Sequence, residues 1–178
     1  MSVDAAVAGW REYIQPLKAA KDKMYLGSPA VSNAAATDNT GLGWLEKFIS
    51  ACTGCSIDFI NIHWYVIDAF FAFHFLHRRH RGLLLNRYDS VDNVAYLKKH
   101  IEDARRVAQG RPIWITEFKP RGTEEQVKRF LNEVMPWMDR SSDIHRYAYF
   151  MARAGEGMLI NDAQSGLSGV GSYYHSHA

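Results

Sequence analysis

The chain has 178 residues, of which 47% are hydrophobic and 22% are charged, so it is long enough for one globular domain with a core of its own. This composition excludes disorder as the main state, and two cysteines exclude a disulfide-dense scaffold. The net charge of +2 is too small for binding through bulk electrostatics, so we expect no nucleic-acid partner. Aromatic residues make up 13% of the chain, which suits either a large core or a sugar-binding cleft.

No targeting or membrane segment is predicted. Residues 1–10 have neither a basic n-region nor an apolar h-region, so we expect no signal peptide in this chain. The most apolar stretch, residues 66–76, contains Asp68 and His74 and runs directly into several arginines. It is too short and too polar for a transmembrane helix, and we expect no membrane span.

The hydrophobic pattern predicts helices and strands that alternate along the chain. A helix begins at Ser2, its expected N-cap, and carries apolar residues at helical spacing as far as Leu17, until Pro16 and the lysines end it. The other expected elements are a strand at 23–27 followed by a loop at 32–40, a short helix at 42–49, a strand at 56–65, a helix at 91–108 that ends before Gly110, a strand at 112–118, a helix from Thr123, which forms a capping box with Gln126, to about 137, a strand at 144–151, and a tail at 159–174 with a turn and a short helix. Because strands alternate with helices, we predict an α/β fold with a parallel sheet.

Polar and aromatic side chains follow these strands at the C-terminal ends, where parallel sheets carry their functional groups. Regular alternation predicts that Glu117 shares a face of its strand with Ile115, and that Asn61, His63 and Tyr65 share a face of theirs. If both faces look into a barrel, a carboxylate, an imidazole and a phenol meet at its mouth.

On spacing alone, Glu117 is open to two interpretations. It is either a catalytic carboxylate or a structural one that caps the next helix or pairs with Lys119 or Arg121. The single Cys-x-x-Cys motif, Cys52 to Cys55, lies at the end of a predicted helix. A thioredoxin-like motif would instead lie at the start of a helix. One such pair also cannot complete a four-ligand zinc site, so we expect a local structural disulfide if the parent protein is secreted.

Seven short motifs occur in order at 27–31, 41–45, 52–55, 58–60, 63–65, 112–118 and 146–150. Together they resemble fungal glycoside hydrolase family 128, the alkali-sensitive-linkage-protein-like glycosyl hydrolase catalytic core. The resemblance runs from Met1 to about Tyr174 apart from one stretch, so we expect residues 1–178 to form a partial catalytic domain. It implies a (β/α)8 TIM barrel that acts on β-1,3-glucan with retention of configuration, uses no cofactor or metal, and works outside the cell or in the cell wall.

The resemblance also implies roles for individual residues. Glu117, in the motif Trp-Ile-Thr-Glu-Phe, matches the catalytic nucleophile. His63 and Tyr65 match residues that line a substrate subsite, and Phe150 would offer a ring to the sugar. Trp64 is either a core residue or a further sugar platform, and we include it among the expected substrate-binding residues.

A retaining mechanism needs a second carboxyl group about 5–5.5 Å from the nucleophile. In this family it belongs to an Asn-Glu-Pro motif after the fourth strand, and no Asn-Glu-Pro occurs in this chain. We therefore expect an N-terminally truncated domain, the C-terminal portion of the barrel with a leading helix and about four β/α units. Open sheet edges in such a portion are expected to favour self-association.

Residues 66–88 depart from the family pattern. They contain no Lys or Glu, and four Arg against one Asp give them a net charge of 4 − 1 = +3. His74, His77 and His80 lie three apart, a spacing that does not hold three metal ligands on one helical face. An apolar half followed by a basic half would suit a helix that binds a membrane surface or a partner. We favour a non-family insertion from an unspliced intron, because the 23 residues correspond to 23 × 3 = 69 nucleotides in frame.

Two functional hypotheses remain. The first is a retaining, endo-β-1,3-glucanase-like hydrolase with Glu117 as nucleophile, whose activity is impaired by the missing acid/base residue. The second is a non-catalytic fragment that still binds carbohydrate.

Overall fold

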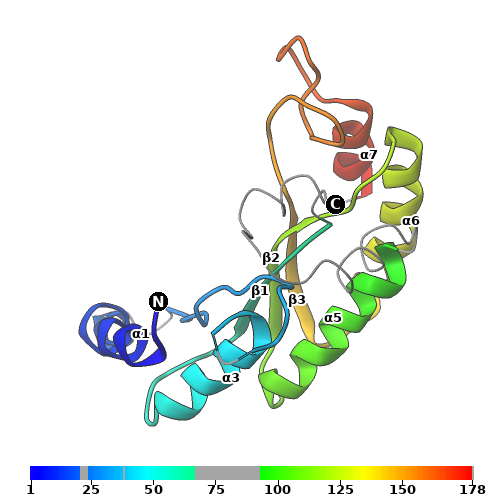
Figure 1. Ribbon diagram of the computed structural model, residues 1–178. Coiled ribbons are helices and arrows are strands. Elements are labelled where there is room, and N and C mark those ends of the chain that lie inside the picture. The colour runs from blue at the N-terminus through cyan, green and yellow to red at the C-terminus, as the bar shows by residue number, and fades with distance from the viewer. Residues whose placement is uncertain (21–23, 38, 67–92, 178) are drawn as a thin grey trace, which may run out of the picture. The chain divides into compact units, whose positions relative to one another are not determined.

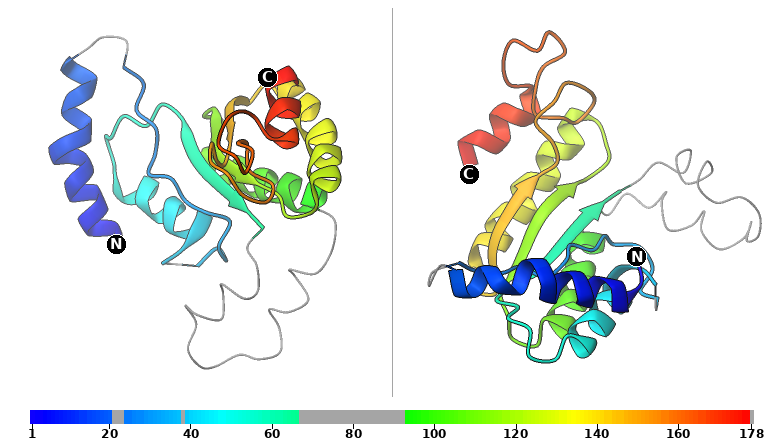
Figure 2. Two further views of the ribbon diagram at one scale, coloured as in Figure 1. Left: turned by 90° about the horizontal axis from the view of Figure 1, so that it is seen from above. Right: turned by 90° about the vertical axis from the view of Figure 1, so that its left-hand side faces the viewer.

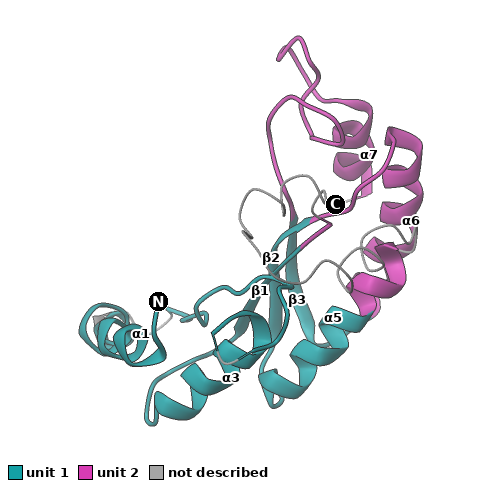
Figure 3. Cartoon of the chain, viewed as in Figure 1, with its two compact units in different colours: residues 1–64, 99–118, 141–148 teal, residues 65–98, 119–140, 149–178 magenta. Residues whose placement is uncertain are grey.

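The computed structural model describes residues 1–20, 24–37, 39–66 and 93–177 (Figure 1). All but the first residue of the expected insertion at 66–88 therefore lies outside the described residues. The chain divides into two compact units, one of residues 1–64, 99–118 and 141–148, the other of residues 65–98, 119–140 and 149–178 (Figure 3).

From α3 onward, helices and strands alternate as predicted. The helical elements are α1 (Val3–Gly9), the π-helical η1 (Trp10–Ile14), α2 (Gln15–Ala20), α3 (Gly41–Ala51), α5 (Asn93–Ala108), α6 (Glu124–Arg140) and α7 (Gly169–His177). The strands are β1 (Ile60–Tyr65), β2 (Ile113–Lys119) and β3 (Ile144–Tyr149). They form one parallel sheet in the order β1-β2-β3 and lie side by side in Figure 2. The α/β prediction is confirmed.

The N-terminal helix begins as predicted, and its helical path ends at Ala20. The Ser2 side chain accepts a hydrogen bond from the Ala5 amide at 3.3 Å, which confirms it as the N-cap. The prediction that Pro16 and the lysines end the helix holds only in part, because α2 continues through Pro16 and Lys18 to Ala20. Proline has no amide hydrogen, and it is tolerated near a helix start. Here it follows the π-helical turn, in which the Gln15 amide donates to the Trp10 carbonyl.

The strand expected at 23–27 is an irregular edge beside β1 rather than a regular strand. Two isolated parallel bridges join the edge segment, residues 24–31, to the chain leading into β1 and to β1 itself, Gly27 to Phe59 and Val31 to Ile62. Pro29 lies between these bridges and lacks an amide hydrogen, which interrupts the ladder. The Ser28 hydroxyl accepts a hydrogen bond from the Asn61 amide at 2.9 Å, so a side chain replaces a backbone group in the ladder.

The core of the first unit is built from alternate strand residues and the apolar faces of α3 and α5. Its side chains with no exposed surface are Leu45, Phe48, Ile60, Ile62, Trp64, Ile101, Ala104, Ile113, Ile115 and Phe118. Each large aliphatic or aromatic side chain contributes roughly 1.5–3 kcal/mol by leaving water. The helix α5 ends as predicted before Gly110, which adopts a φ of +83° that a side chain would disfavour.

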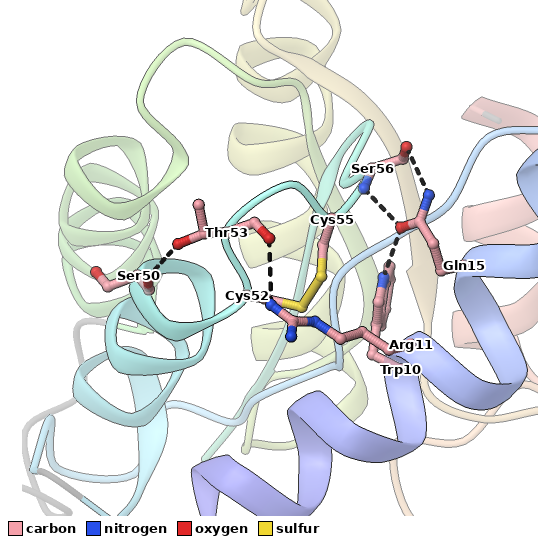
Figure 4. The surroundings of a disulfide bond; sticks show 8 residues. All are labelled: Trp10, Arg11, Gln15, Ser50, Cys52, Thr53, Cys55 and Ser56. Atoms are coloured by element: carbon pink, nitrogen blue, oxygen red, sulfur yellow. Dashed lines mark hydrogen bonds between the residues drawn. A yellow bond between two sulfur atoms is a disulfide. The ribbon is translucent and has the colours of Figure 1, made fainter.

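The expected structural disulfide is present, and it lies in a loop that holds the N-terminal helix (Figure 4). Cys52 and Cys55 are joined directly after α3. Gln15 donates to the Ser56 hydroxyl at 3.0 Å and accepts from the Ser56 amide at 2.8 Å. Arg11 donates to the Thr53 carbonyl at 3.2 Å. The bonded cysteines thus belong to a structural loop within the first unit.

In the second unit, α6 begins with the predicted capping box. The Thr123 amide donates to the Gln126 side chain at 2.8 Å, and the Gln126 amide donates to the Thr123 hydroxyl at 3.4 Å. The helix continues beyond 137 to Arg140 and contains Pro136. The short C-terminal helix is confirmed as α7, which contacts α6. None of the helices in the described part of the chain combines the length and apolar character that a membrane crossing needs.

Candidate active site

The first unit brings His63 and Glu117 together at the C-terminal ends of β1 and β2. The Thr116 hydroxyl donates to the Asn61 side-chain oxygen at 2.5 Å, and His63 Nδ1 lies 3.5 Å from Glu117 Oε2. Asn61 and His63 are two residues apart and share one face of β1, whereas their partners on β2 are consecutive. Consecutive residues of a regular strand point to opposite faces, so β2 contains an extra residue at this point.

The backbone register agrees with a one-residue bulge in β2. The Ile60 amide donates to the Pro112 carbonyl at 2.8 Å, and the Val66 amide donates to the Lys119 carbonyl at 3.1 Å. Between these bonds β1 advances by six residues and β2 by seven. The prediction that Glu117 shares a face with the isoleucines of β2 is therefore wrong. Both isoleucines have no exposed surface, whereas 33% of the Glu117 side chain is exposed.

The His63 and Glu117 side chains form an accessible acid-base pair. The His63 side chain is 24% exposed, so both groups contact the core on one side and solvent on the other. When protonated, the imidazole makes an ion pair with the carboxylate, and when neutral it remains a short distance from a strong acceptor. A carboxylate held beside an imidazole in this way has the chemistry needed for a nucleophile or a base.

A half-buried polar chain supports the strand ends next to this pair. Ser28 is only 3% exposed and accepts from the Asn61 amide, while the Asn61 side chain accepts from Thr116. The bonds link the edge segment, β1 and β2 beside the His63–Glu117 pair. No Ser-His-Asp arrangement was expected from the sequence, and in these bonds Ser28 has a structural role.

Tyr65 and Phe150 form an aromatic pair in the second unit. Tyr65 is the last residue of β1, and Phe150 directly follows β3. Their ring centroids lie 5.4 Å apart with an interplanar angle of 77°, an edge-to-face contact, and both residues are partly exposed. Partly exposed rings of this kind are suited to contact with the C–H surface of a sugar.

Trp64 has a different environment from the residues on either side of it. Its side chain is 0% exposed, because it points to the buried face of β1 between His63 and Tyr65. Of the two roles weighed for Trp64, the structure shows core packing, and a buried indole offers no face to a sugar.

Sequence reasoning missed one residue next to the candidate pair. His100, on α5, is 7% exposed, and a ring N–H donates to the backbone carbonyl of His63. Burial lowers the pKa of His100 to about 4, so the ring is neutral near physiological pH. The available signal was a polar residue directly before Ile101, on the apolar side of a predicted helix.

The described residues contain no group of three or more His, Cys, Asp or Glu side chains arranged to hold a metal ion. The three histidines between 74 and 80 that were weighed as ligands lie outside those residues.

The family model described as glycosyl hydrolase catalytic core matches residues 1–81 and 83–174. The chain belongs to this family, and the resemblance to family 128 is confirmed. Alkali-sensitive linkage protein 1 of Schizosaccharomyces pombe is 30% identical over 189 residues, a match that covers 98% of this chain and 29% of that protein.

Solved structures of family 128 enzymes share the fold. A subgroup III curdlan-specific exo-β-1,3-glucanase from Blastomyces gilchristii, in complex with glucose, is 34% identical with a TM-score of 0.70, covering 98% of this chain and 62% of that one. A subgroup II endo-β-1,3-glucanase from Sorangium cellulosum is 25% identical with a TM-score of 0.74, covering 100% of this chain and 64% of that one. The chain thus spans less than two thirds of these relatives. Its parallel sheet with helical crossovers is that of part of a (β/α)8 barrel, as expected.

Proposed function

We propose that this chain carries the nucleophile half of a retaining glycoside hydrolase site for β-1,3-glucan, with Glu117 as the nucleophile. The observation that supports this most is the bulge in β2, which turns Glu117 to the face of His63. Bulges next to active sites commonly redirect a side chain in this way. Membership of the glycosyl hydrolase family and the β-1,3-glucanase activities of the solved relatives support β-1,3-glucan as the substrate.

In the proposed first step, a Glu117 oxygen attacks the anomeric carbon and the glycosidic oxygen leaves with the bonding electrons. An alkoxide is a poor leaving group, so that oxygen must receive a proton from an acid. The single Asn-Glu sequence of the chain, Asn132–Glu133, lies within α6 and is followed by valine, not proline. We therefore propose that this chain lacks the acid/base residue and hydrolyses natural glucan slowly.

Tyr65 and Phe150 are proposed as aromatic contacts for glucose units, and His63 as a polar contact near the nucleophile. The partly exposed Tyr65–Phe150 pair also supports the second candidate, a fragment that binds glucan without cleaving it. The disulfide supports an oxidising location such as the cell surface or cell wall.

Incubation with insoluble β-1,3-glucan separates the two candidates. Release of reducing ends that disappears in Glu117→Gln supports the hydrolase, whereas sedimentation with glucan without release supports the binding fragment. Glu133→Gln is the matched control, because this carboxylate lies on α6 with 57% of its side chain exposed. β-1,4-Glucan serves as the substrate control. If the chain neither binds the glucan nor releases reducing ends, both candidates are contradicted.

Two further proposals concern the chain itself. We propose that it self-associates with a second copy through the sheet edges, since β3 ends the strand order and the edge segment 24–31 is irregularly paired. Light scattering that gives a monomer at all concentrations would contradict this. We also propose that residues 66–88 are a non-family insertion from an unspliced intron. A transcript that keeps codons 66–88 in most messages would contradict this.

A further inference from the structure

His100 occupies a core position with an unusual hydrogen-bonding state. It lies on α5 directly before Ile101, which is 0% exposed, and is itself 7% exposed. One ring nitrogen donates to the His63 carbonyl, whereas Nε2 has no hydrogen-bond partner among the described residues. The donor is therefore Nδ1–H, and the neutral ring leaves its acceptor nitrogen buried and unsatisfied.

This arrangement contributes little to stability. A buried unsatisfied polar atom costs more free energy than one hydrogen bond returns. A leucine of similar volume would fill the position without this cost. The effect of His100 must therefore be sought in the backbone that it contacts.

We propose that His100 is a positioning residue for the candidate site, which fixes the β1 backbone at His63 and so holds the His63 imidazole beside Glu117. The inference rests on the proposed function of Glu117. The His63 amide donates to the Val31 carbonyl at 2.8 Å, and its carbonyl accepts from His100. With both backbone groups of His63 held, the direction of its side chain is set, and functional side chains need placement to within about 0.5 Å.

The surroundings of His100 keep its ring a neutral donor. Desolvation is the largest effect and disfavours the charged form. On α5, Asp103 raises the pKa of His100 and Lys99 lowers it, while on β1 the His63 carbonyl raises it. The net result is a ring that donates one hydrogen bond to β1 and carries no charge beneath the site.

The test compares three variants of the full chain. His100→Leu removes the donor and retains the volume. His100→Asn keeps a donor near the position of Nδ1. Ile101→Val is the matched control, because it removes one methylene from the next core position of α5.

Two readouts are followed: the NMR signals of the His63 carbonyl carbon and the Glu117 carboxyl carbon, and the affinity for a β-1,3-linked glucotriose. We expect His100→Leu to shift both signals and to weaken binding by about three- to tenfold, the equivalent of one hydrogen bond. His100→Asn should restore the signals and bring affinity to within about twofold of wild type. Ile101→Val should leave both readouts unchanged.

Signals and affinity of His100→Leu that match those of Ile101→Val would overturn the proposal. NMR signals and an affinity in His100→Leu that are as close to wild type as those of His100→Asn would also overturn it. If the wild-type chain fails to bind the trisaccharide, the proposed function fails. The His63 and Glu117 signals then decide the positioning role by themselves, since they require no ligand.

Discussion

Lowering the pH from about 7 to about 4.5 should destabilise the folded chain through His100. The pKa of this ring is lowered from 6.5 to about 4 by burial. An unfolded chain therefore binds a proton at His100 below pH 6.5, whereas the folded chain does not bind it until about pH 4. The stability associated with the neutral ring is complete above pH 6.5 and is lost as the pH falls towards 4.

The magnitude follows from the two pKa values. Each pH unit between them corresponds to roughly 1.4 kcal/mol, so the difference between 6.5 and about 4 amounts to about 3 kcal/mol. Most of this, about 2 kcal/mol or slightly more, is lost by about pH 4.5. Such a loss is a large fraction of the roughly 5–15 kcal/mol that stabilises a typical domain.

Urea unfolding of the wild type and of His100→Asn at both pH values measures this loss. Asparagine does not titrate, so the wild type should lose about 2 kcal/mol more than the variant on acidification. Asp58, Asp103 and Asp143 have pKa values lowered from 3.8, so their contributions are lost only at lower pH. Equal losses in wild type and variant would refute a buried, neutral His100.

Three further predictions test the described packing by urea unfolding. Arg105→Lys should cost about 1 kcal/mol near neutral pH, because Arg105 holds Asp143 through two hydrogen bonds, at 2.7 and 3.0 Å, that lysine cannot both make. This loss should shrink below about pH 3.8, since Arg105 lowers the pKa of Asp143 and protonation removes the ion pair. An unchanged loss in acid would contradict that pairing. Thr123→Ala should cost about 1 kcal/mol by removing the capping box of α6, and no change would show that the cap is not formed in solution. Gly27→Ala should cost about 1–3 kcal/mol, because a Cβ atom there would overlap the Phe59 ring, and an unchanged midpoint of unfolding would contradict this close approach.

The sequence was most informative where one local pattern decides the structure. Apolar spacing predicts α3, α5 and α6, and Thr123 with Gln126 predicts the start of α6, because capping depends on residues within one turn. Alternation along β1 also separates Trp64 from His63 and Tyr65, and the structure agrees with it.

Two features of the candidate site depend on contacts between distant segments. The bulge at Thr116 and Glu117 is set by the pairing of β2 with β1. The pattern of residue types within β2 gives no sign of an extra residue. His100 acquires its role from a backbone carbonyl of another element, a contact that its own neighbours in sequence do not reveal. A strand was predicted at 23–27 because these residues favour one, whereas in the structure residues 24–27 belong to an irregular edge in which Pro29 and the Ser28 side chain alter the ladder.

Covalent trapping tests the role of Glu117 most directly. A 2-deoxy-2-fluoro-β-laminaribioside with a dinitrophenolate leaving group needs no protonation, so its reaction does not require the acid/base residue, and the fluorine slows release of the glycosyl ester. We predict that the wild-type chain gains one fluorinated laminaribiosyl group, which mass spectrometry locates on the peptide that contains Glu117. The Glu133→Gln variant should gain the same group to the same extent. The absence of this adduct, its presence at another residue, or its persistence in Glu117→Gln would contradict Glu117 as the nucleophile.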